Sequence, residues 1–339
     1  MTKFLNSKTD PTPQISPPLQ NPLVVFEQED ISKKLKKFKS SEEIRIVYFG
    51  TTEFSAYILE KLFEYFQNPA QTLILYPGGA GTNLKFIIQS VVTTPDRPVG
   101  RTQQLTPSPV SLVAQKHKLP TLKPEKLDQD FLRNHQVFLE AELFVVIFYG
   151  KIIPQIILDL PNLGAINVHP SLLPNYRGAS PVQAAILNGD KETGVTIIKM
   201  DEKMDHGPIL SVAKLSISDE DNTQTLSNKT TQLAFKELLK LLPKFAQGQT
   251  PSTAQDETKA TYCHIFKKED GYFDINNPPT PEILDRMIRA YYPWPNAWTK
   301  WNEKIIKFLP GGMVQMEGKK AVKLADFLNG YPNFPIKQL

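Results

Sequence analysis

Several features that define other classes of protein are scarce or missing in this 339-residue chain. Cysteine occurs once, at Cys263, which excludes a disulfide within the chain and any zinc or iron–sulfur site built from several cysteines. The longest purely apolar run, residues 143–148, is far shorter than the roughly 20 residues that a membrane-spanning helix requires. No apolar stretch near the start has the pattern of a secretory signal peptide. We therefore expect a cytoplasmic protein in a reducing compartment.

An excess of charge of one sign is also missing. The chain has 39 lysines and arginines against 35 aspartates and glutamates, a net charge of +4. Hydrophobic residues make up 40% and charged residues 22%, a balance that excludes disorder over the whole chain. This charge permits contact with nucleic acid without requiring it, and a solvated mixed-charge surface is the simpler interpretation.

The first 43 residues differ from the rest of the chain. Residues 7–22 are rich in proline and polar residues and cannot bury a core, and residues 31–39 contain five lysines. A run of this kind is most simply a solvated helix face, and a basic arm that meets phosphates is the alternative. We predict a flexible polar and basic extension over residues 1–43.

An alternation of apolar strands and helices begins at Ile44. Short apolar runs predict strands at residues 44–50, 86–93, 143–148, 164–168 and 195–200, and helical spacing of apolar residues predicts a helix within residues 51–66. Strands that alternate with helices are typical of an α/β fold with a Rossmann-like, mostly parallel sheet. We assign residues 44–245 to this domain and expect ligands beyond the carboxyl ends of its strands.

Two glycine-containing segments lack the motifs of nucleotide-binding sites. Residues 67–83 have no Gly-Lys-Ser/Thr ending, so the phosphate loop is disfavoured and a surface insertion is expected. The turn after the first strand has one glycine, Gly50, where a dinucleotide site needs three. A nicotinamide-dependent enzyme is therefore disfavoured.

The C-terminal part of the chain predicts a second, smaller unit. A polar linker is expected over residues 246–260, and a small β-rich domain over residues 261–339. Thr280 and Pro281 are suited to the cap and first position of a helix, and short strands are expected around Gly311 and Gly312.

The clearest chemical signal lies at the end of the fourth predicted strand, where residues 164–178 read GAINVHPSLLPNYRG. Strand alternation places Asn167 and His169 on the same side of the sheet. An amide and an imidazole that emerge together can stabilise an oxyanion while a neighbouring group handles a proton. The alternative is that His169 is a structural histidine with satisfied hydrogen bonds.

An acidic partner for this histidine is expected in residues 200–210, which read MDEKMDHGPIL. Asp205 is suited to accept a hydrogen bond from the imidazole, which fixes the tautomer and favours the imidazolium. Asp201 lies four residues away and competes for the role, although an aspartate near a glycine is also a common turn residue. Spacing alone does not choose between them.

Several longer stretches resemble the methionyl-tRNA formyltransferase family, from Ile44 nearly to the end of the chain. The INVHPSLLP block is shared by the wider folate-dependent formyltransferases, whereas the loop over residues 94–109 and the PWPNAW stretch resemble the tRNA-modifying branch. The stretches that carry the resemblance are residues 45–55, 91–110 (VVTTPDRPVGRTQQLTPSPV), 149–154 (YGKIIP), 166–210, 255–262 (QDETKATY), 267–274 and 288–298 (IRAYYPWPNAW).

The resemblance implies a role for particular residues. It implies that Asn167, His169 and Asp205 are catalytic. It implies contacts with the 10-formyltetrahydrofolate co-substrate from Ser171, Leu172, Leu173, Pro174, Tyr149, Gly150 and Lys151. Arg101 and Arg97 are expected to meet methionyl initiator tRNA. The C-terminal unit is expected to be OB-like, a fold suited to nucleic acid, and we expect a monomer that needs no metal.

The implied reaction is attack by the methionine amine on the formyl carbon, with the developing oxyanion held by Asn167 and His169. Two alternatives are weighed: formyl transfer to an amino sugar nucleotide or purine precursor, and an inactive relative that binds folate or RNA. This chain departs from its relatives at His206, where a small residue is usual. Its C-terminal unit also has few residues for a complete five-stranded barrel.

Overall fold

The computed structural model describes residues 43–68, 84–100 and 103–338. The expected N-terminal extension up to residue 42, residues 69–83 of the expected insertion, and Arg101 lie outside the described residues.

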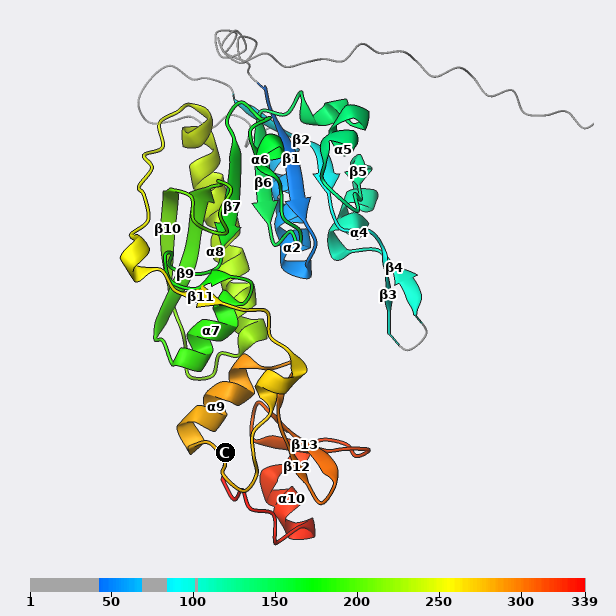
Figure 1. Ribbon diagram of the computed structural model, residues 1–339, viewed down its shortest axis with the longest axis vertical. Coiled ribbons are helices and arrows are strands. Elements are labelled where there is room, and N and C mark those ends of the chain that lie inside the picture. Colours follow the sequence, from blue (N-terminus) through cyan, green and yellow to red (C-terminus); the bar gives the residue numbers. More distant parts are fainter. Residues whose placement is uncertain (1–42, 69–83, 101–102, 339) are drawn as a thin grey trace, which may run out of the picture. The chain divides into compact units, whose positions relative to one another are not determined.

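A seven-stranded sheet forms the centre of the described catalytic region, in the order β10-β9-β7-β6-β1-β2-β5 (Figure 1). Neighbours from β7 to β5 are parallel, and β9 and β10 are antiparallel additions at one edge. The strands are β1 (Glu43–Gly50), β2 (Lys85–Val92), β5 (Thr121–Leu122), β6 (Leu143–Ile147), β7 (Ala165–His169), β9 (Glu192–Lys199) and β10 (Ile209–Ser216). The predicted α/β fold with a mostly parallel sheet is confirmed.

The five predicted strands correspond to β1, β2, β6, β7 and β9, with ends that agree within three residues. β10 was not predicted, because alternate residues of this edge strand are exposed and its apolar signal is therefore weak. β5 has two residues, too few for a periodic signal.

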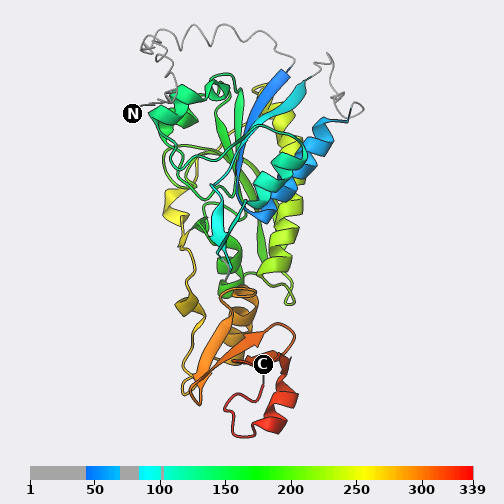
Figure 2. The ribbon, with the colours of Figure 1, turned by 90° about the vertical axis from the view of Figure 1, so that its right-hand side faces the viewer.

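Helices cover both faces of this sheet (Figure 2). One face packs against α2 (Glu53–Phe66), α4 (Pro109–Lys116) and α8 (Thr223–Ala246); the other packs against α5 (Gln129–Asn134), the short helix Gln136–Phe138 and α6 (Gln155–Leu158). No helix in the described ranges is both long enough and apolar enough to cross a bilayer.

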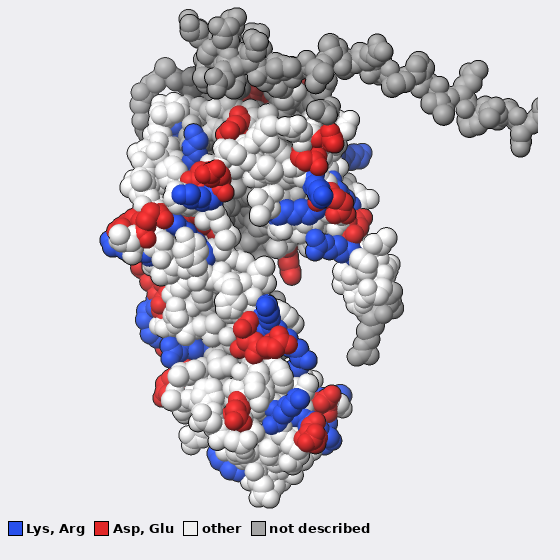
Figure 3. Space-filling view, viewed as in Figure 1, with Lys and Arg blue, Asp and Glu red and all other residues white. Residues whose placement is uncertain are grey.

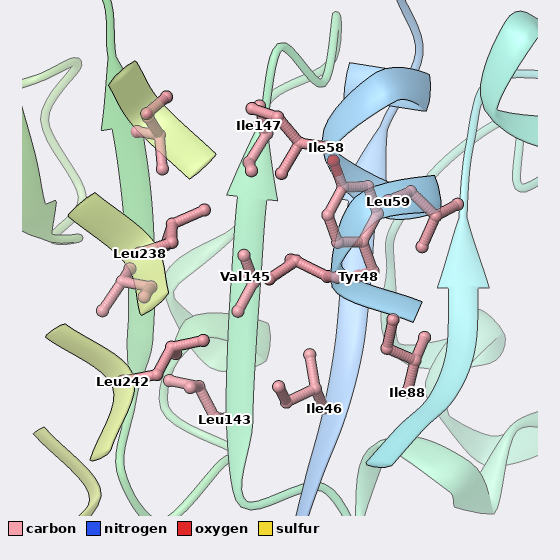
Figure 4. Close-up of a cluster of buried hydrophobic side chains, with 14 of the residues drawn as sticks. Ile46, Tyr48, Ile58, Leu59, Ile88, Leu143, Val145, Ile147, Leu238 and Leu242 are labelled. Atoms are coloured by element: carbon pink, nitrogen blue, oxygen red, sulfur yellow. The ribbon is translucent and has the colours of Figure 1, made fainter. Parts of the chain in front are cut away.

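The larger core lies between the sheet and helices α2 and α8 (Figure 4). Leu238 and Leu242 of α8 point toward the strand residues Leu143 and Val145, and Leu59 of α2 lies beside Tyr48. These side chains are at most 1% exposed, and burial of each contributes about 1.5–3 kcal/mol. The apolar side chains at helical spacing in α8 and at alternating positions in β6 therefore pack into one apolar layer.

The turn from β1 into α2 requires a small residue. A Cβ atom on Gly50 would lie 1.8 Å from Oγ of Ser55, so only glycine fits this close approach. The Thr52 side chain then accepts a hydrogen bond from the Ser55 amide and caps the helix.

A hairpin occupies the loop predicted over residues 94–109. Strands β3 (Arg97–Val99) and β4 (Gln104–Thr106) pair antiparallel and project from the sheet (Figure 1). All of their residues are exposed.

The C-terminal region is β-rich, as predicted. Its antiparallel sheet has four strands among the described residues, β12 (Ala297–Trp301), β13 (Lys304–Leu309), β14 (Met313–Met316) and β15 (Val322–Lys323). They pack with α9 (Pro281–Ala290) and α10 (Leu324–Gly330) around a separate core. Thr280 caps α9 and Pro281 follows it, as expected from the sequence.

The chain before this region runs along the catalytic sheet. It contains the short helix Glu257–Lys259 and strand β11 (Tyr262–Cys263), which pairs with β8 (Arg177–Gly178) just before α7 (Pro181–Asn188). The predicted division at residues 246–260 stays a prediction.

Replacement of Leu238 by alanine tests the contribution of the α8 core. We expect Leu238→Ala to lower the free energy of unfolding by about 2–5 kcal/mol, because a fully buried leucine leaves a cavity. Urea denaturation measures this change. Gln232→Ala, at an exposed position of the same helix, is the control and is expected to change stability by about 0.5 kcal/mol or less. Equal effects of the two replacements would contradict the packing described here.

Candidate active site

Asn167 and His169 lie on β7, on the face of the sheet that packs against α5 and α6. Ile166 and Val168 belong to the core on the opposite face, so strand alternation directs residues 165, 167 and 169 away from it. Asn167 is in register with Val146 of the parallel neighbour β6. The residues that follow β6 and β7 therefore leave the sheet at the same carboxyl edge.

Asp205 reaches these side chains from a different direction. Strand β9 is antiparallel to β7, so the loop after β9 begins beside Ala165, where the Met200 amide donates to the Ala165 carbonyl. The loop then crosses the sheet face and brings Asp205 to Asn167 and His169. The sequence analysis did not predict that the Asp205 loop crosses the face of the sheet.

The structure brings the three predicted catalytic side chains into contact. Nδ2 of Asn167 donates to Oδ1 of Asp205 at 3.1 Å, and Nδ1 of His169 lies 3.5 Å from Oδ2 of Asp205. The side chains of His169 and Asp205 are only 5% and 13% exposed. Asn167 is half-buried, and its second N–H has no hydrogen-bond partner in the described part of the chain.

A backbone amide also donates a hydrogen bond to the Asp205 carboxylate. The Gly178 amide donates to Oδ2 of Asp205 at 2.8 Å. Gly178 has a φ of +111°, and a Cβ atom there would lie 2.3 Å from the Cys263 carbonyl oxygen. A side chain at this position is therefore excluded by both backbone conformation and space.

Both ring nitrogens of His169 face oxygen acceptors. Nε2 lies 2.8 Å from the carbonyl oxygen of Tyr176, which accepts only, so this nitrogen carries the proton. Nδ1 faces the Asp205 carboxylate. A neutral ring has one N–H, so only the imidazolium donates to both acceptors.

Asp201, the alternative acidic partner, interacts elsewhere. Its Oδ2 atom lies 2.6 Å from Nδ1 of His206, and Oδ1 accepts from the Lys203 amide. Nε2 of His206 lies 3.5 Å from Glu257. His206 therefore lies between the carboxylates of Asp201 and Glu257, next to Asp205 in the same loop.

The predicted folate segment, Ser171 to Pro174, is held in place mainly by hydrogen bonds to Thr196 of β9. The hydroxyl of Thr196 donates to the Ser171 carbonyl and accepts from the Leu173 amide. Ser171 and Leu173 are buried, and the Ser171 hydroxyl donates to the Asn175 carbonyl. The side chains that stay partly exposed to a ligand are Leu172 and Pro174.

The second predicted folate segment follows β6. The Tyr149 ring packs against Phe49 at 5.4 Å, and its buried hydroxyl has no hydrogen-bond partner in the described residues. Burial raises the pKa of Tyr149 to about 12, so the hydroxyl keeps its proton. Gly150 is exposed, whereas Nζ of Lys151 donates to the carbonyl oxygens of Pro124 and Glu125.

Arg97, the described member of the predicted tRNA pair, is exposed on strand β3 of the hairpin. Two contributors to the catalytic cluster were not predicted: the Gly178 amide and the Tyr176 carbonyl. Both act through the backbone, so residue type carries no direct signal for them. No group of three or more potential metal-ligating side chains occurs in the described ranges.

Comparison with known proteins identifies the class of this chain as a formyltransferase. Residues 80–242 match the family described as Formyl transferase, and residues 266–311 match Formyl transferase, C-terminal domain. A methionyl-tRNA formyltransferase of Pseudomonas syringae pv. tomato is 36% identical over 290 residues, 86% of each chain. The protein belongs to the methionyl-tRNA formyltransferase family.

Solved structures share the fold at lower identity. A sugar N-formyltransferase from Shewanella has a TM-score of 0.58 at 18% identity, and the match covers 78% of this chain and 96% of that one. An N-formyltransferase from Helicobacter canadensis, in complex with folinic acid and dTDP-3-aminofucose, has a TM-score of 0.53 at 17% identity, over 80% and 95% of the two chains.

Cys263 lies close to the catalytic cluster, and the reactivity of its thiol tests how far this cysteine is buried. Burial, and then the charge of Asp205, raise the pKa of the Cys263 thiol. The thiolate fraction at pH 8 is then smaller than in free cysteine. We expect folded protein to react with iodoacetamide more slowly than free cysteine, with a rate that still rises above pH 9. In urea the difference should vanish, and a folded rate equal to that of free cysteine would contradict the burial.

Proposed function

We propose that this enzyme transfers a formyl group from 10-formyltetrahydrofolate to the α-amine of methionine on initiator tRNA. The observation that carries the proposal is the cluster in which Asn167 donates to Asp205 and His169 lies 3.5 Å from it, in a chain related over most of its length to methionyl-tRNA formyltransferases. Formyl transfer of this kind needs an oxyanion donor and a proton acceptor and requires no metal ion. We further propose a monomer that acts in the cytoplasm.

The residues near Tyr149 and Leu172 fit a folate co-substrate, which supplies the formyl group. The Tyr149 hydroxyl is a buried donor without a partner in the described residues, and such groups are normally hydrogen-bonded. Leu172 and Pro174 add partly exposed apolar surface next to the catalytic strand. We propose that these residues bind the co-substrate at the carboxyl edge of β6 and β7.

Asn167 is the most direct donor for the oxyanion. One of its N–H groups is held by Asp205, which fixes the amide plane, and the other is available to the formyl oxygen. A donor fixed before reaction costs no reorganisation when charge develops, and such a donor contributes about 2.7–4 kcal/mol in comparable acyl transfers.

His169 is the second residue placed to stabilise the oxyanion. Its two ring nitrogens face the Tyr176 carbonyl and the Asp205 carboxylate, so a direct hydrogen bond to the substrate requires the ring to leave the Tyr176 carbonyl. A proton on both ring nitrogens would place positive charge beside Asn167, where the His169 side chain is only 5% exposed. Asp205 then accepts a proton from the attacking amine and relays it to the folate nitrogen, which leaves as its bond to the formyl carbon breaks.

The tRNA is expected to reach the site along the hairpin. Arg97 is exposed there, together with Val99 (56% exposed) and Leu105 (67% exposed), which offer apolar surface for an unstacked nucleotide. Elsewhere, on the face in Figure 3, positive and negative side chains are intermixed. Recognition is therefore expected to depend on local contacts such as this hairpin.

Replacement of Asn167 by alanine tests the oxyanion donor. We expect Asn167→Ala to lower kcat by about 100- to 1,000-fold with little change in folate affinity, because the lost hydrogen bond forms only as charge develops. Formylation of methionyl initiator tRNA measures kcat, and fluorescence titration measures folate binding. Asn162→Ala, at an exposed position before β7, is the control. An Asn167→Ala enzyme with wild-type kcat would remove this residue from the mechanism.

Replacement of Arg97 by alanine tests the hairpin. We expect Arg97→Ala to raise the KM for tRNA and to reduce the salt dependence of tRNA binding by about one ion, with the KM for folate unchanged. Lys236→Ala, an exposed cation on α8, is the matched control. A change in folate KM instead would mean that the hairpin serves the co-substrate.

One assay separates the proposed function from its alternatives. Purified protein is mixed with 10-formyltetrahydrofolate and either methionyl initiator tRNA, an amino sugar nucleotide or a purine precursor. Formylation of the tRNA supports the proposal. Transfer only to a small amine assigns the protein to another branch, and binding without turnover identifies an inactive relative.

A further inference from the structure

The least exposed charged residue of the catalytic region lies next to the candidate site. Arg177 is 1% exposed and is the largest of the fully buried side chains among the described residues. A buried charge is costly unless it is paired and hydrogen-bonded. Its place in β8, directly before Gly178, connects it to the amide that binds Asp205.

Each of the five N–H groups of Arg177 has an acceptor. Nη1 and Nη2 bind the two carboxylate oxygens of Glu257 at 2.9 and 2.6 Å, and Nη1 also donates to the Tyr262 hydroxyl at 3.3 Å. Nε and Nη2 donate to Oε1 of Gln255 at 3.1 and 2.8 Å. The guanidinium therefore fixes the amide orientation of Gln255, because its oxygen must face the arginine.

Gln255 uses its remaining atoms on the loop that carries Asp205. Its Nε2 group donates to the carbonyl oxygens of Asp205 at 2.9 Å and Gly207 at 2.8 Å. Asp205 has a φ of +51°, a left-handed conformation that is uncommon for residues other than glycine. The two hydrogen bonds hold the backbone on the C-terminal side of this strained residue.

We propose that Gln255, oriented by Arg177, is a positioning residue that sets the carboxylate of Asp205 against Asn167 and His169. Strand β8 therefore acts twice on Asp205: Arg177 orients Gln255, which binds its backbone, and the Gly178 amide donates to its carboxylate. Gln255 and Arg177 do not contact the reacting atoms. Both act through the geometry of Asp205.

Glu257 anchors the outer end of this arrangement. It is 54% exposed and is shared between Arg177 and His206. The hydrogen bond from Arg177 is the main cause that lowers the pKa of Glu257, so the carboxylate stays charged near neutral pH. The arginine therefore keeps its partner, and Gln255 keeps its orientation, under conditions of turnover.

The competing interpretation is that Arg177 and Gln255 only attach residues 255–262 to the catalytic region. That role predicts lower stability without a change at Asp205. Positioning predicts that the contacts of Asp205 change even where stability does not.

The test uses Gln255→Glu in the full-length chain. Glutamate keeps an oxygen for Arg177 but replaces the donor group with an oxygen that faces two carbonyls. We expect kcat for formylation of methionyl initiator tRNA to fall by about 10- to 100-fold, with both KM values within about threefold. Gln249→Glu makes the same change at an exposed position six residues earlier and is expected to leave kcat unchanged. Gln255→Met, neutral and of similar length, repeats the loss of the donor if the glutamate variant does not fold.

A spectroscopic arm is independent of activity, whereas the kinetic arm rests on the proposed function. In protein labelled with ¹⁵N-glycine, which has 17 glycines, the Gly178 amide reports on Asp205 directly. We expect its resonance to shift and its hydrogen exchange to accelerate in Gln255→Glu. If wild-type protein formylates no tRNA but Gly178 responds, the proposed function fails and the positioning role stands.

A double-mutant cycle with Asp205→Asn completes the test. If Gln255 acts through Asp205, Gln255→Glu should cost little further kcat in the Asp205→Asn background. Additive losses in kcat would overturn the proposal. So would an unchanged Gly178 resonance in Gln255→Glu, with or without lower thermal stability.

Discussion

The candidate site depends on one carboxylate that is held in place by several donors. Asp205 is largely buried and lies in a left-handed backbone conformation, so both its charge and its geometry require compensation. Asn167 and the Gly178 amide donate to its two oxygens, and His169 faces it. The hydrogen bond from Asn167 to Asp205 also fixes the amide that the proposed reaction uses, and the Gly178 amide fixes the carboxylate itself. Loss of the carboxylate position would therefore affect the amide and the imidazole together.

Three segments that are distant in sequence supply this cluster, and each is held by a different physical means. Strand β7 is fixed by sheet pairing, the Asp205 loop by its crossing of the sheet face, and residues 255–263 by the buried guanidinium of Arg177 and by pairing with β8. The antiparallel direction of β9 is what sends the Asp205 loop across the face instead of away from the site. The predicted folate and tRNA segments lie on strands and loops that need no such crossing.

Much of the architecture was accessible from local pattern. Apolar runs predicted β1, β2, β6, β7 and β9, because a buried strand is a short continuous apolar segment. The cap at Thr280 and the shared side of Asn167 and His169 follow equally local rules. The edge strand β10 and the hairpin β3–β4 were missed, since exposed strands lack that signal. Within the Asp-rich loop, spacing did not distinguish Asp201 from Asp205.

The sequence by itself determined the α/β class, the location of the amide and imidazole, and the family resemblance, because these depend on residue type and on short-range periodicity. Only the tertiary structure decided which aspartate faces His169, which backbone groups complete the cluster, and why a glutamine 50 residues after Asp205 lies against it. These contacts join residues that are far apart in the sequence, at separations that follow neither helix nor strand periodicity. They follow from strand direction and from the need to satisfy one buried arginine, which are properties of the whole fold.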